Sequence, residues 1–200
     1  MMKKNRPFSH NAIIQNINRF ISLNQEEEDL YLSFLTEKKF KKKEFPLIPG
    51  SIAKFDYYIV KGCLKVYLID NRGVEHISMF AVEDWWTGDL SSFLTQEPTS
   101  YFIQALEVTE VLQISKTNFD SLFDQIPKFE RFYRIIFQKS LISQIQRSDD
   151  NISLSAEGKY LSFIEKYPFL INRISQKDIA AYIGVTPEFL SNIKRKITFT

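Results

Sequence analysis

Residues 174–195 read ISQKDIAAYIGVTPEFLSNIKR, and this stretch decides how the end of the chain folds. Ser175 is a favourable residue to cap the start of a helix. Gly184 can take the left-handed backbone conformation that ends one. Thr186 can cap a second helix, and Pro187 suits its first position because no amide hydrogen is needed there. The stretch therefore predicts two short helices joined by a tight glycine turn.

The side chains of these two helices separate into an inward and an outward face. Ile179 and Ile183 form the inward stripe of the first helix, and Leu190 and Ile193 form that of the second. Ala180 is small where the second helix must approach closely. The outward face of the second helix presents Pro187, Glu188, Ser191, Asn192 and Arg195. This pattern is typical of a helix-turn-helix, whose second helix enters the major groove of DNA.

The C-terminal quarter is also more basic than the rest of the chain. Residues 151–200 hold seven of the 26 Lys and Arg and four of the 24 Asp and Glu, which leaves residues 1–150 slightly acidic. A basic segment on a nearly neutral body fits contact with nucleic acid. The residues predicted to contact DNA are Ser175, Gln176, Thr186, Pro187, Glu188, Ser191, Asn192, Lys194, Arg195 and Lys196. The alternative is an ordinary helix pair with a solvated polar face and a basic last turn that complements the helix dipole.

The first part of the chain predicts helices followed by strands. Residues 10–40 show apolar positions at three-and-four spacing, interrupted near 23–24, which predicts two helices. Five lysines within residues 38–43 are predicted to lie at a solvated helix end. From 45 to 115, short β-rich runs alternate with turn residues. The predicted strands cover residues 52–60, 63–69, 74–80, 101–106 and 108–114, the last two as a pair. Together these elements predict an α+β fold with an antiparallel jelly roll or small barrel.

A long helix is predicted from about Pro127 onward. Its apolar stripe, predicted to pair with a twin in a homodimer, consists of Phe129, Tyr133, Ile136, Phe137, Leu141 and Ile145. The polar residues 148–151 follow and predict a hinge. We therefore expect a sensor domain at 1–125, a dimerisation helix with its hinge at 126–150, and a DNA-binding domain at 151–200. Because the recognition helix runs almost to the last residue, we expect the wing of a winged helix to be missing or short.

Composition excludes several classes of protein. With 44% hydrophobic and 14% aromatic residues the chain can form packed cores, which excludes disorder of the whole chain. The longest apolar run, residues 179–183, is far shorter than the about 20 residues of a membrane-spanning helix. No apolar signal core follows the basic N-terminus, so we expect a cytoplasmic protein without membrane contact.

Histidine and cysteine are too few for the metal sites considered. Cys63 is the single cysteine, so it cannot hold a zinc ion or a four-iron cluster unaided. A cupin metal site needs two or three histidines on neighbouring strands, whereas the chain has only His10 and His76. No glycine-rich phosphate loop or nucleophile motif is present. We expect no metal, no cofactor and no enzyme activity.

The order of a β-rich domain, a long helix and a helix-turn-helix resembles the Crp/Fnr family of bacterial transcription regulators. Residues 156–161 and Tyr167-Pro168 strengthen the resemblance, which is to members without a characterised ligand that are common in Bacteroidetes-type bacteria. The resemblance implies a homodimeric regulator that binds an approximately palindromic DNA operator, with RNA polymerase as a further suggested partner. It also implies a jelly roll of the cyclic-nucleotide-binding type. The alternative is a ligand-binding signalling module whose C-terminal helices contact a protein.

Within the recognition helix the match to the family is uneven. The base-reading glutamate of the family falls on Glu188, which is suited to accept from a cytosine amino group. The arginine often found just before it is Pro187 here, and Ser191 matches a serine that some members use. The next arginine, usually a guanine reader, is Asn192, which is better suited to adenine. We therefore do not expect the usual operator sequence of the family.

The phosphate-binding cassette of the family is matched only at its start. Gly88-Asp89-Leu90 corresponds to its Gly-Glu-Leu, with a shorter acid that can still reach a ribose hydroxyl. The arginine that would pair with a cyclic phosphate falls on Thr99, beside Ser100. Without it the phosphate loses a charge-assisted and often bidentate partner. We therefore expect the domain to take an effector other than cyclic AMP, or none, and the sequence leaves that effector open.

Overall fold

The computed structural model describes residues 8–198, which divide into two compact units. Unit 1 comprises the described residues up to Val66 together with Phe80–Phe137, and unit 2 comprises Tyr67–Met79 together with the residues from Gln138 onward. The predicted short or missing wing involves residues 199–200, which lie outside the described part. Among residues 8–198, none of the helices combines the length and the apolar character that crossing a membrane requires.

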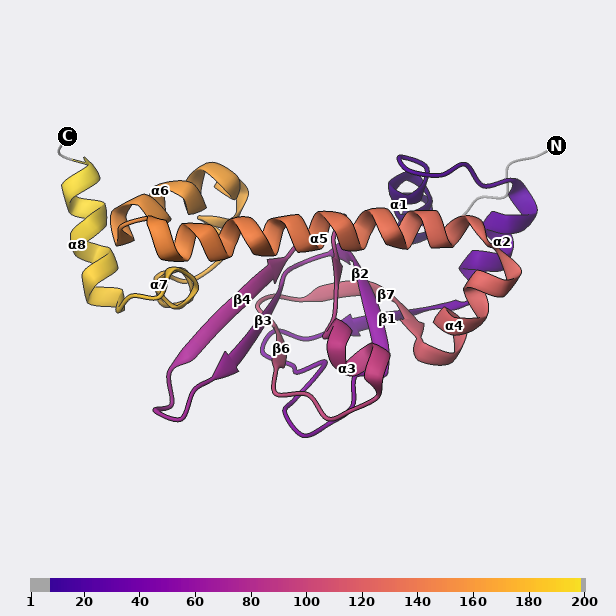
Figure 1. Ribbon diagram of the computed structural model, residues 1–200, viewed down its shortest axis with the longest axis horizontal. Coiled ribbons are helices and arrows are strands. Elements are labelled where there is room, and N and C mark those ends of the chain that lie inside the picture. Colours follow the sequence, from indigo (N-terminus) through magenta and orange to yellow (C-terminus); the bar gives the residue numbers. More distant parts are fainter. Residues whose placement is uncertain (1–7, 199–200) are drawn as a thin grey trace. The chain divides into compact units, whose positions relative to one another are not determined.

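Figure 1 shows how the helices and strands follow one another along the chain. Their bounds are α1 Phe8–Ile17, α2 Gln25–Ser33, β1 Leu35–Phe40, β2 Phe55–Lys61, β3 Leu64–Ile69, β4 Glu75–Ala81, β5 Trp86–Thr87, α3 Leu90–Thr95, β6 Phe102–Ala105, β7 Thr109–Ser115, α4 Lys116–Gln125, α5 Lys128–Ser153, α6 Ala156–Lys166, a 3-10 turn η1 Pro168–Leu170, α7 Gln176–Ile183 and α8 Pro187–Thr198.

The strands form two sheets, in the orders β1-β7-β2-β5 and β4-β3-β6. In the first sheet every neighbouring pair is antiparallel, with β7 between β1 and β2: Leu112 faces Glu37 of β1 on one side and Tyr58 of β2 on the other. Two sheets in which strands far apart in the sequence are neighbours are the arrangement of a jelly roll. The predicted α+β class and the jelly-roll architecture are therefore confirmed.

The helix predicted to reach Phe40 was wrong in its last part. Residues Leu35–Phe40 are strand β1, which pairs with β7 along its whole length, from Leu35 opposite Ile114 to Phe40 opposite Thr109. The lysine run at 38–43 accordingly lies on an edge strand and the turn after it, not at a helix end. Exposed lysines on an edge strand discourage pairing with another chain. The pairing partner lies on a strand distant in the sequence, so local periodicity could not show it.

The predicted pair of the last two strands was also wrong. Strand β6 belongs to the sheet with β3 and β4, whereas β7 lies between β1 and β2 in the other sheet. The short segment between them therefore crosses from one sheet to the other. The Thr109 hydroxyl accepts from the backbone N–H of Cys63 at 3.2 Å, which ties the start of β7 to the chain just before β3.

An aromatic cluster forms the core beneath the first turns of α5, within unit 1. The ring of Phe129 stacks on Tyr31 of α2 at 4.5 Å between centroids, and Tyr133 meets Phe119 of α4 edge-on at 4.8 Å. Phe129 is 0% and Tyr133 2% exposed. Such side chains cannot face a second chain, which corrects their predicted place in the dimer interface. Their burial attaches the start of α5 to the core of unit 1.

The hinge predicted at 148–151 is a continuous part of α5, which ends only at Ser153. Hydrogen bonds of polar side chains stabilise the last turns of α5. The Ser153 hydroxyl donates to the Asp149 carbonyl at 2.7 Å, and Ser162 of α6 donates to the Asp150 carboxylate at 3.1 Å. Ser155 then caps α6 by accepting from the Gly158 N–H. The break in the helical path therefore falls at 154–155.

Candidate nucleic-acid interface

The two C-terminal helices begin and end at the capping residues that the sequence indicates. The Ser175 hydroxyl accepts from the Asp178 backbone N–H at 3.0 Å at the start of α7. Gly184 ends α7 with a φ of 77°, in the left-handed region that favours glycine. The Thr186 hydroxyl accepts from the backbone N–H of Phe189 at 3.2 Å, and Pro187 occupies the first position of α8. The glycine turn and the caps fix the entry of α8.

The inward faces of both helices are buried as expected. Ile179 and Ile183 of α7 and Leu190 and Ile193 of α8 are all buried, and so is the small Ala180. A second layer comes from α6, where Phe163 packs on the ring of Tyr182. Unit 2 therefore has its own apolar core, and α8 is held against it by one face only.

The opposite face of α8 carries the side chains predicted to read bases. Exposed residues among those predicted to contact DNA are Ser175, Gln176, Thr186, Pro187, Glu188, Ser191, Asn192, Arg195 and Lys196. Glu188 is a carboxylate acceptor in the first turn, and Asn192 lies one turn later on the same side. Arg195 donates to the Asn192 side-chain oxygen, so these two groups form a linked pair on the outer face. The arrangement presents both acceptors and donors, which are the groups that base edges require.

Two of the three basic residues at the end of α8 contact other helices of unit 2. Lys194 donates to the Gln176 side chain of α7 at 3.0 Å, and Lys196 forms an ion pair with Glu157 of α6 at 2.8 Å. These exposed pairs contribute little to stability. Both ammonium groups remain at the rim of the exposed face of α8, where a phosphate can replace the present partner.

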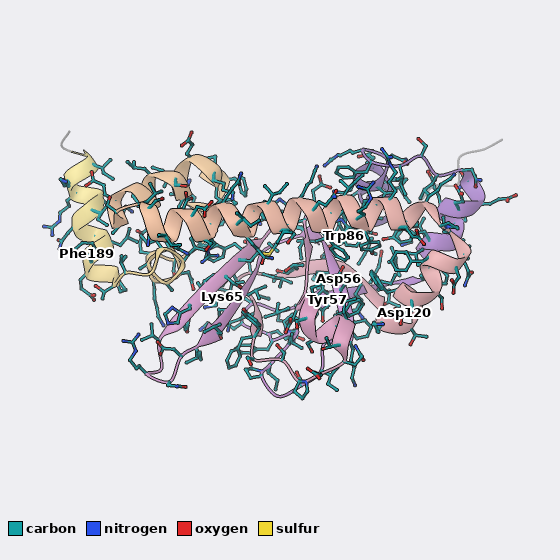
Figure 2. The ribbon with its side chains drawn as sticks, in the orientation of Figure 1. Asp56, Tyr57, Lys65, Trp86, Asp120 and Phe189 are labelled. Atoms are coloured by element: carbon teal, nitrogen blue, oxygen red, sulfur yellow. The ribbon has the colours of Figure 1, made fainter. Side chains whose placement is uncertain are left out.

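Sequence reasoning missed Phe189, which lies in the first turn of α8 (Figure 2). Its side chain is 51% exposed, although its neighbour Leu190 is fully buried. A phenylalanine next to an inward leucine is easily assigned to the core, but here its side chain is half exposed. The signal in the sequence was the register, because a residue 100° from the inward stripe falls at the edge of the outer face.

The residues of the phosphate cassette come together, but as a closed pair. The Thr99 hydroxyl donates to the Asp89 carboxylate, and both side chains are buried. Asp89 also caps α3 by accepting from the Ser92 N–H. Leu90 and Ser100 are exposed. A carboxylate and a neutral hydroxyl occupy the place where an anionic phosphate needs a cation, so the cassette positions offer no charge partner for it.

Gly88 brings the cassette next to an acid on the neighbouring strand β2. A Cβ at this position would lie 2.9 Å from Oδ1 of Asp56, so the glycine leaves room for that carboxylate. Because Tyr58 lies opposite Trp86 in the strand pair, and side chains two residues apart on a strand share a face, Asp56 points to the same side of the sheet as both rings. Within residues 8–198 no basic side chain forms an ion pair with Asp56, and burial of the carboxylate raises its pKa to about 7.

Replacing Asp56 with asparagine should remove a pH dependence of stability. In the folded chain the pKa is about 7 against an ordinary value of 3.8, so the folded state binds the proton more tightly. The contribution of Asp56 to stability is therefore highest at low pH and is lost as pH rises from about 4 to about 7. We expect Asp56→Asn to be more stable than the wild type by about 4 kcal/mol at pH 8 and nearly equal to it near pH 4.

Urea unfolding followed by tryptophan fluorescence measures this effect, because both tryptophans, Trp85 and Trp86, lie in unit 1. Asp124→Asn is the matched control, since this exposed acid of α4 loses the same charge in the same unit. A pH-independent difference between Asp56→Asn and the wild type would contradict the titration of Asp56.

The exposed apolar stripe of α5 lies further along the helix than the sequence indicates. Leu141, Ile145 and Ile152 are 59%, 52% and 84% exposed and share one side of the helix, with Ile142 beside them. Of the other residues predicted for a dimer interface, Ile136 and Phe137 are half-buried. Four neighbouring apolar side chains in water are the mark of an interaction surface.

Arg147 organises unit 2 and was not predicted. Its guanidinium donates to the backbone carbonyls of Ile77 and Ser78 in β4 and, at 3.2 Å, to the carbonyl of Tyr182 in α7. It also lies over the Tyr182 ring, 4.0 Å from the centroid. Lys177 of α7 adds a weak ion pair with Glu75 of β4 at 3.7 Å. The hairpin residues of unit 2 are thus attached to α7.

Comparison with protein-family models gives one match, which covers residues 37–126 and is described as the cyclic nucleotide-binding domain. Residues 37–126 are therefore similar to a cyclic nucleotide-binding domain. A search of curated protein sequences finds no significant match. The family match ends just before α5, so α5 and the helices after it can be compared with known proteins only through their structure.

Solved structures extend the likeness over most of the chain. The global regulator CLP of Xanthomonas campestris, titled as responsive to c-di-GMP, is 14% identical with a TM-score of 0.72, covering 88% of this chain and 92% of its own. FixK2 of Bradyrhizobium japonicum is 16% identical with a TM-score of 0.72, covering 82% and 85%. A Crp/Fnr-family transcriptional regulator from Eubacterium rectale is 14% identical with a TM-score of 0.70, covering 88% and 84%. The chain has the fold of these Crp/Fnr-type structures, so the resemblance is confirmed for the fold.

Proposed function

We propose that this chain is a sequence-specific DNA-binding transcription regulator that acts as a homodimer. The observation that carries the proposal is the outer face of α8, on which Glu188, Ser191 and Asn192 are exposed while the opposite face is buried. A helix held by one face, with base-compatible groups on the other, suits entry into the major groove. As a Crp/Fnr-type regulator it would act in the cytoplasm, with RNA polymerase as a further partner.

The exposed stripe of α5 supports the homodimer. A two-fold axis along this stripe would bury Leu141, Ile145 and Ile152 against their twins. Two recognition helices would then enter successive major grooves about 34 Å apart, so the operator would be an approximate palindrome. We propose the three parts 1–125, 126–150 and 151–200 as the sensor, dimerisation and DNA-binding segments.

We further propose that the effector is not cyclic AMP. The closed pair of Asp89 and Thr99 supports this, because it fills the cassette with an acid and a neutral hydroxyl. A ligand bound by this domain would have to draw its affinity from other groups, and the nature of that ligand is open.

The DNA-reading role predicts two kinds of mutant effect. Glu188→Ala should weaken binding by about 1–3 kcal/mol on the specific duplex only, because it removes a hydrogen bond to a base. Lys196→Ala should weaken binding to all sequences alike and lower the slope of log K against log salt by about 0.9 for each phosphate that is no longer neutralised. Binding curves on a specific and a scrambled duplex at several salt concentrations measure both effects.

The specific duplex would come from selection of genomic fragments by the purified protein. Equal losses on both duplexes for the two variants would show that Glu188 is no base reader. The second candidate function, a signalling module that binds a protein, is favoured by the Lys196–Glu157 ion pair and the exposed Phe189. It predicts no salt-dependent binding to either duplex.

A further inference from the structure

The exposed ring of Phe189 is the feature of the α8 surface that the proposed function does not use. Its backbone N–H is held by the cap at Thr186, so the start of its side chain is fixed by the start of the helix. No aromatic ring among the described residues packs against it, and half of the side chain is open to water. A phenylalanine at this position leaves more apolar surface in contact with water than an alanine or a serine would, which is unfavourable.

Its neighbours place the ring at the edge of the base-reading face. Phe189 follows Glu188 directly and precedes Asn192 by three residues, so the ring and the Asn192 amide are neighbours on the helix surface. Lys196, seven residues on, lies on the same side and marks the rim. The ring would therefore enter the groove together with Glu188 and Asn192. It would lie between these two side chains and the sugar-phosphate backbone of the DNA.

The major groove offers one kind of apolar group to such a ring. Each base edge presents hydrogen-bond donors and acceptors, and thymine alone adds a C5 methyl group. Packing of the ring on this methyl removes apolar surface of both from water. Phenylalanine has no hydrogen-bonding group, so it cannot read any other feature of a base edge.

We propose that Phe189 reads the C5 methyl of a thymine in each half-site, next to the base pair that Glu188 contacts. This methyl reading rests on the proposed DNA-binding function and deepens it by naming a further specificity residue. It makes the half-site favour thymine at one position for an apolar reason, independent of the hydrogen bonds made by Glu188 and Asn192. Removal of the methyl should weaken binding about three- to fivefold per half-site.

Deoxyuridine tests this directly, because it differs from thymidine only by the missing methyl. Each thymine of a selected operator is replaced by deoxyuridine in turn, and binding of the wild-type chain is measured. One symmetric thymine position should show about a three- to fivefold loss of affinity per half-site. Phe189→Ala should bind the thymine duplex as weakly as the wild type binds the deoxyuridine duplex, and should no longer distinguish the two.

Two control variants separate methyl reading from other causes. Phe169→Ala removes a similarly exposed phenylalanine of the same unit, at 46% exposure in η1, and should keep full sensitivity to deoxyuridine. Glu188→Ala should bind more weakly yet also keep that sensitivity. Circular dichroism checks that Phe189→Ala remains folded, as expected for an exposed side chain.

The outcomes distinguish methyl reading from the function on which it rests. Sequence-specific binding without any deoxyuridine-sensitive thymine, or sensitivity that persists in Phe189→Ala, overturns methyl reading and leaves the DNA-binding function standing. An equal loss for Phe189→Ala on specific and scrambled duplexes also overturns it. Absence of sequence-specific binding by the wild-type chain overturns the DNA-binding function itself, and methyl reading with it.

Discussion

If the proposed dimer forms along α5, Ile145→Glu should turn it into a monomer and weaken operator binding by roughly 10²–10⁴-fold. Ile145 lies in the middle of the exposed stripe, between Leu141 and Ile152 on one side of α5. In a two-fold dimer each introduced carboxylate would be buried close to its twin, which costs far more than the missing apolar packing. A monomer binds one half-site only, so the gain from linking two binding events disappears.

Size-exclusion chromatography with light scattering measures the mass, and titration with the operator duplex measures the affinity. Gln144→Glu is the matched control, because it places the same charge one residue earlier, on a polar and exposed side of α5. It should leave both the mass and the affinity unchanged. A wild-type chain that runs as a monomer at micromolar concentration would refute the proposed dimer at once.

Local signals in the sequence were sufficient to predict α7, α8 and the turn between them. The caps at Ser175 and Thr186 and the turn at Gly184 act within four residues of themselves, so residue type and spacing are enough to locate them. The jelly roll could be predicted as a class for a related reason, since short alternating runs with turns between them are also local. The pairing of those runs could not, because strand partners are chosen by the fold as a whole.

In the first part of α5, the apolar pattern predicts a dimer interface where the side chains are in fact buried in unit 1. Phe129, Tyr133, Ile136 and Leu141 look like one stripe at helical spacing, yet the first two fill the core of unit 1. An apolar face reads the same in sequence whether a domain or a second chain covers it. Only the exposed fractions separate the two uses, and they move the exposed stripe toward Ile152.

In the candidate site, too, some features follow from local sequence and others depend on contacts between distant residues. The exposed polar residues of α8 follow from the helix register, whereas the role of Arg147 depends on carbonyl groups of a hairpin that is distant in the sequence. No spacing rule connects an arginine with backbone acceptors, because every residue carries such an acceptor. The hydrogen bond from Thr99 to Asp89 could not be predicted from the sequence either, although the sequence shows that position 99 is not an arginine.

Arg147→Ala should loosen the attachment between the β4 segment and α7. The substitution removes charge-assisted hydrogen bonds to three carbonyl groups and the stacking on the Tyr182 ring. Hydrogen bonds from a charged group contribute about 1.5–3 kcal/mol each, and they share one side chain, so we expect a loss of about 2–4 kcal/mol in unit 2. Arg147→Lys should recover only part of it, because an ammonium cannot reproduce the planar fork of donors.

Hydrogen exchange read by mass spectrometry can locate this loss. Peptides covering residues 67–79 and 176–183 should both exchange faster in Arg147→Ala, because the guanidinium holds the two segments to each other. Peptides from β7, in unit 1, should exchange as in the wild type. Gln146→Ala, at the adjacent exposed position of α5, is the control and should change neither segment. Faster exchange in only one of the two segments would mean that Arg147 packs against that segment without joining it to the other.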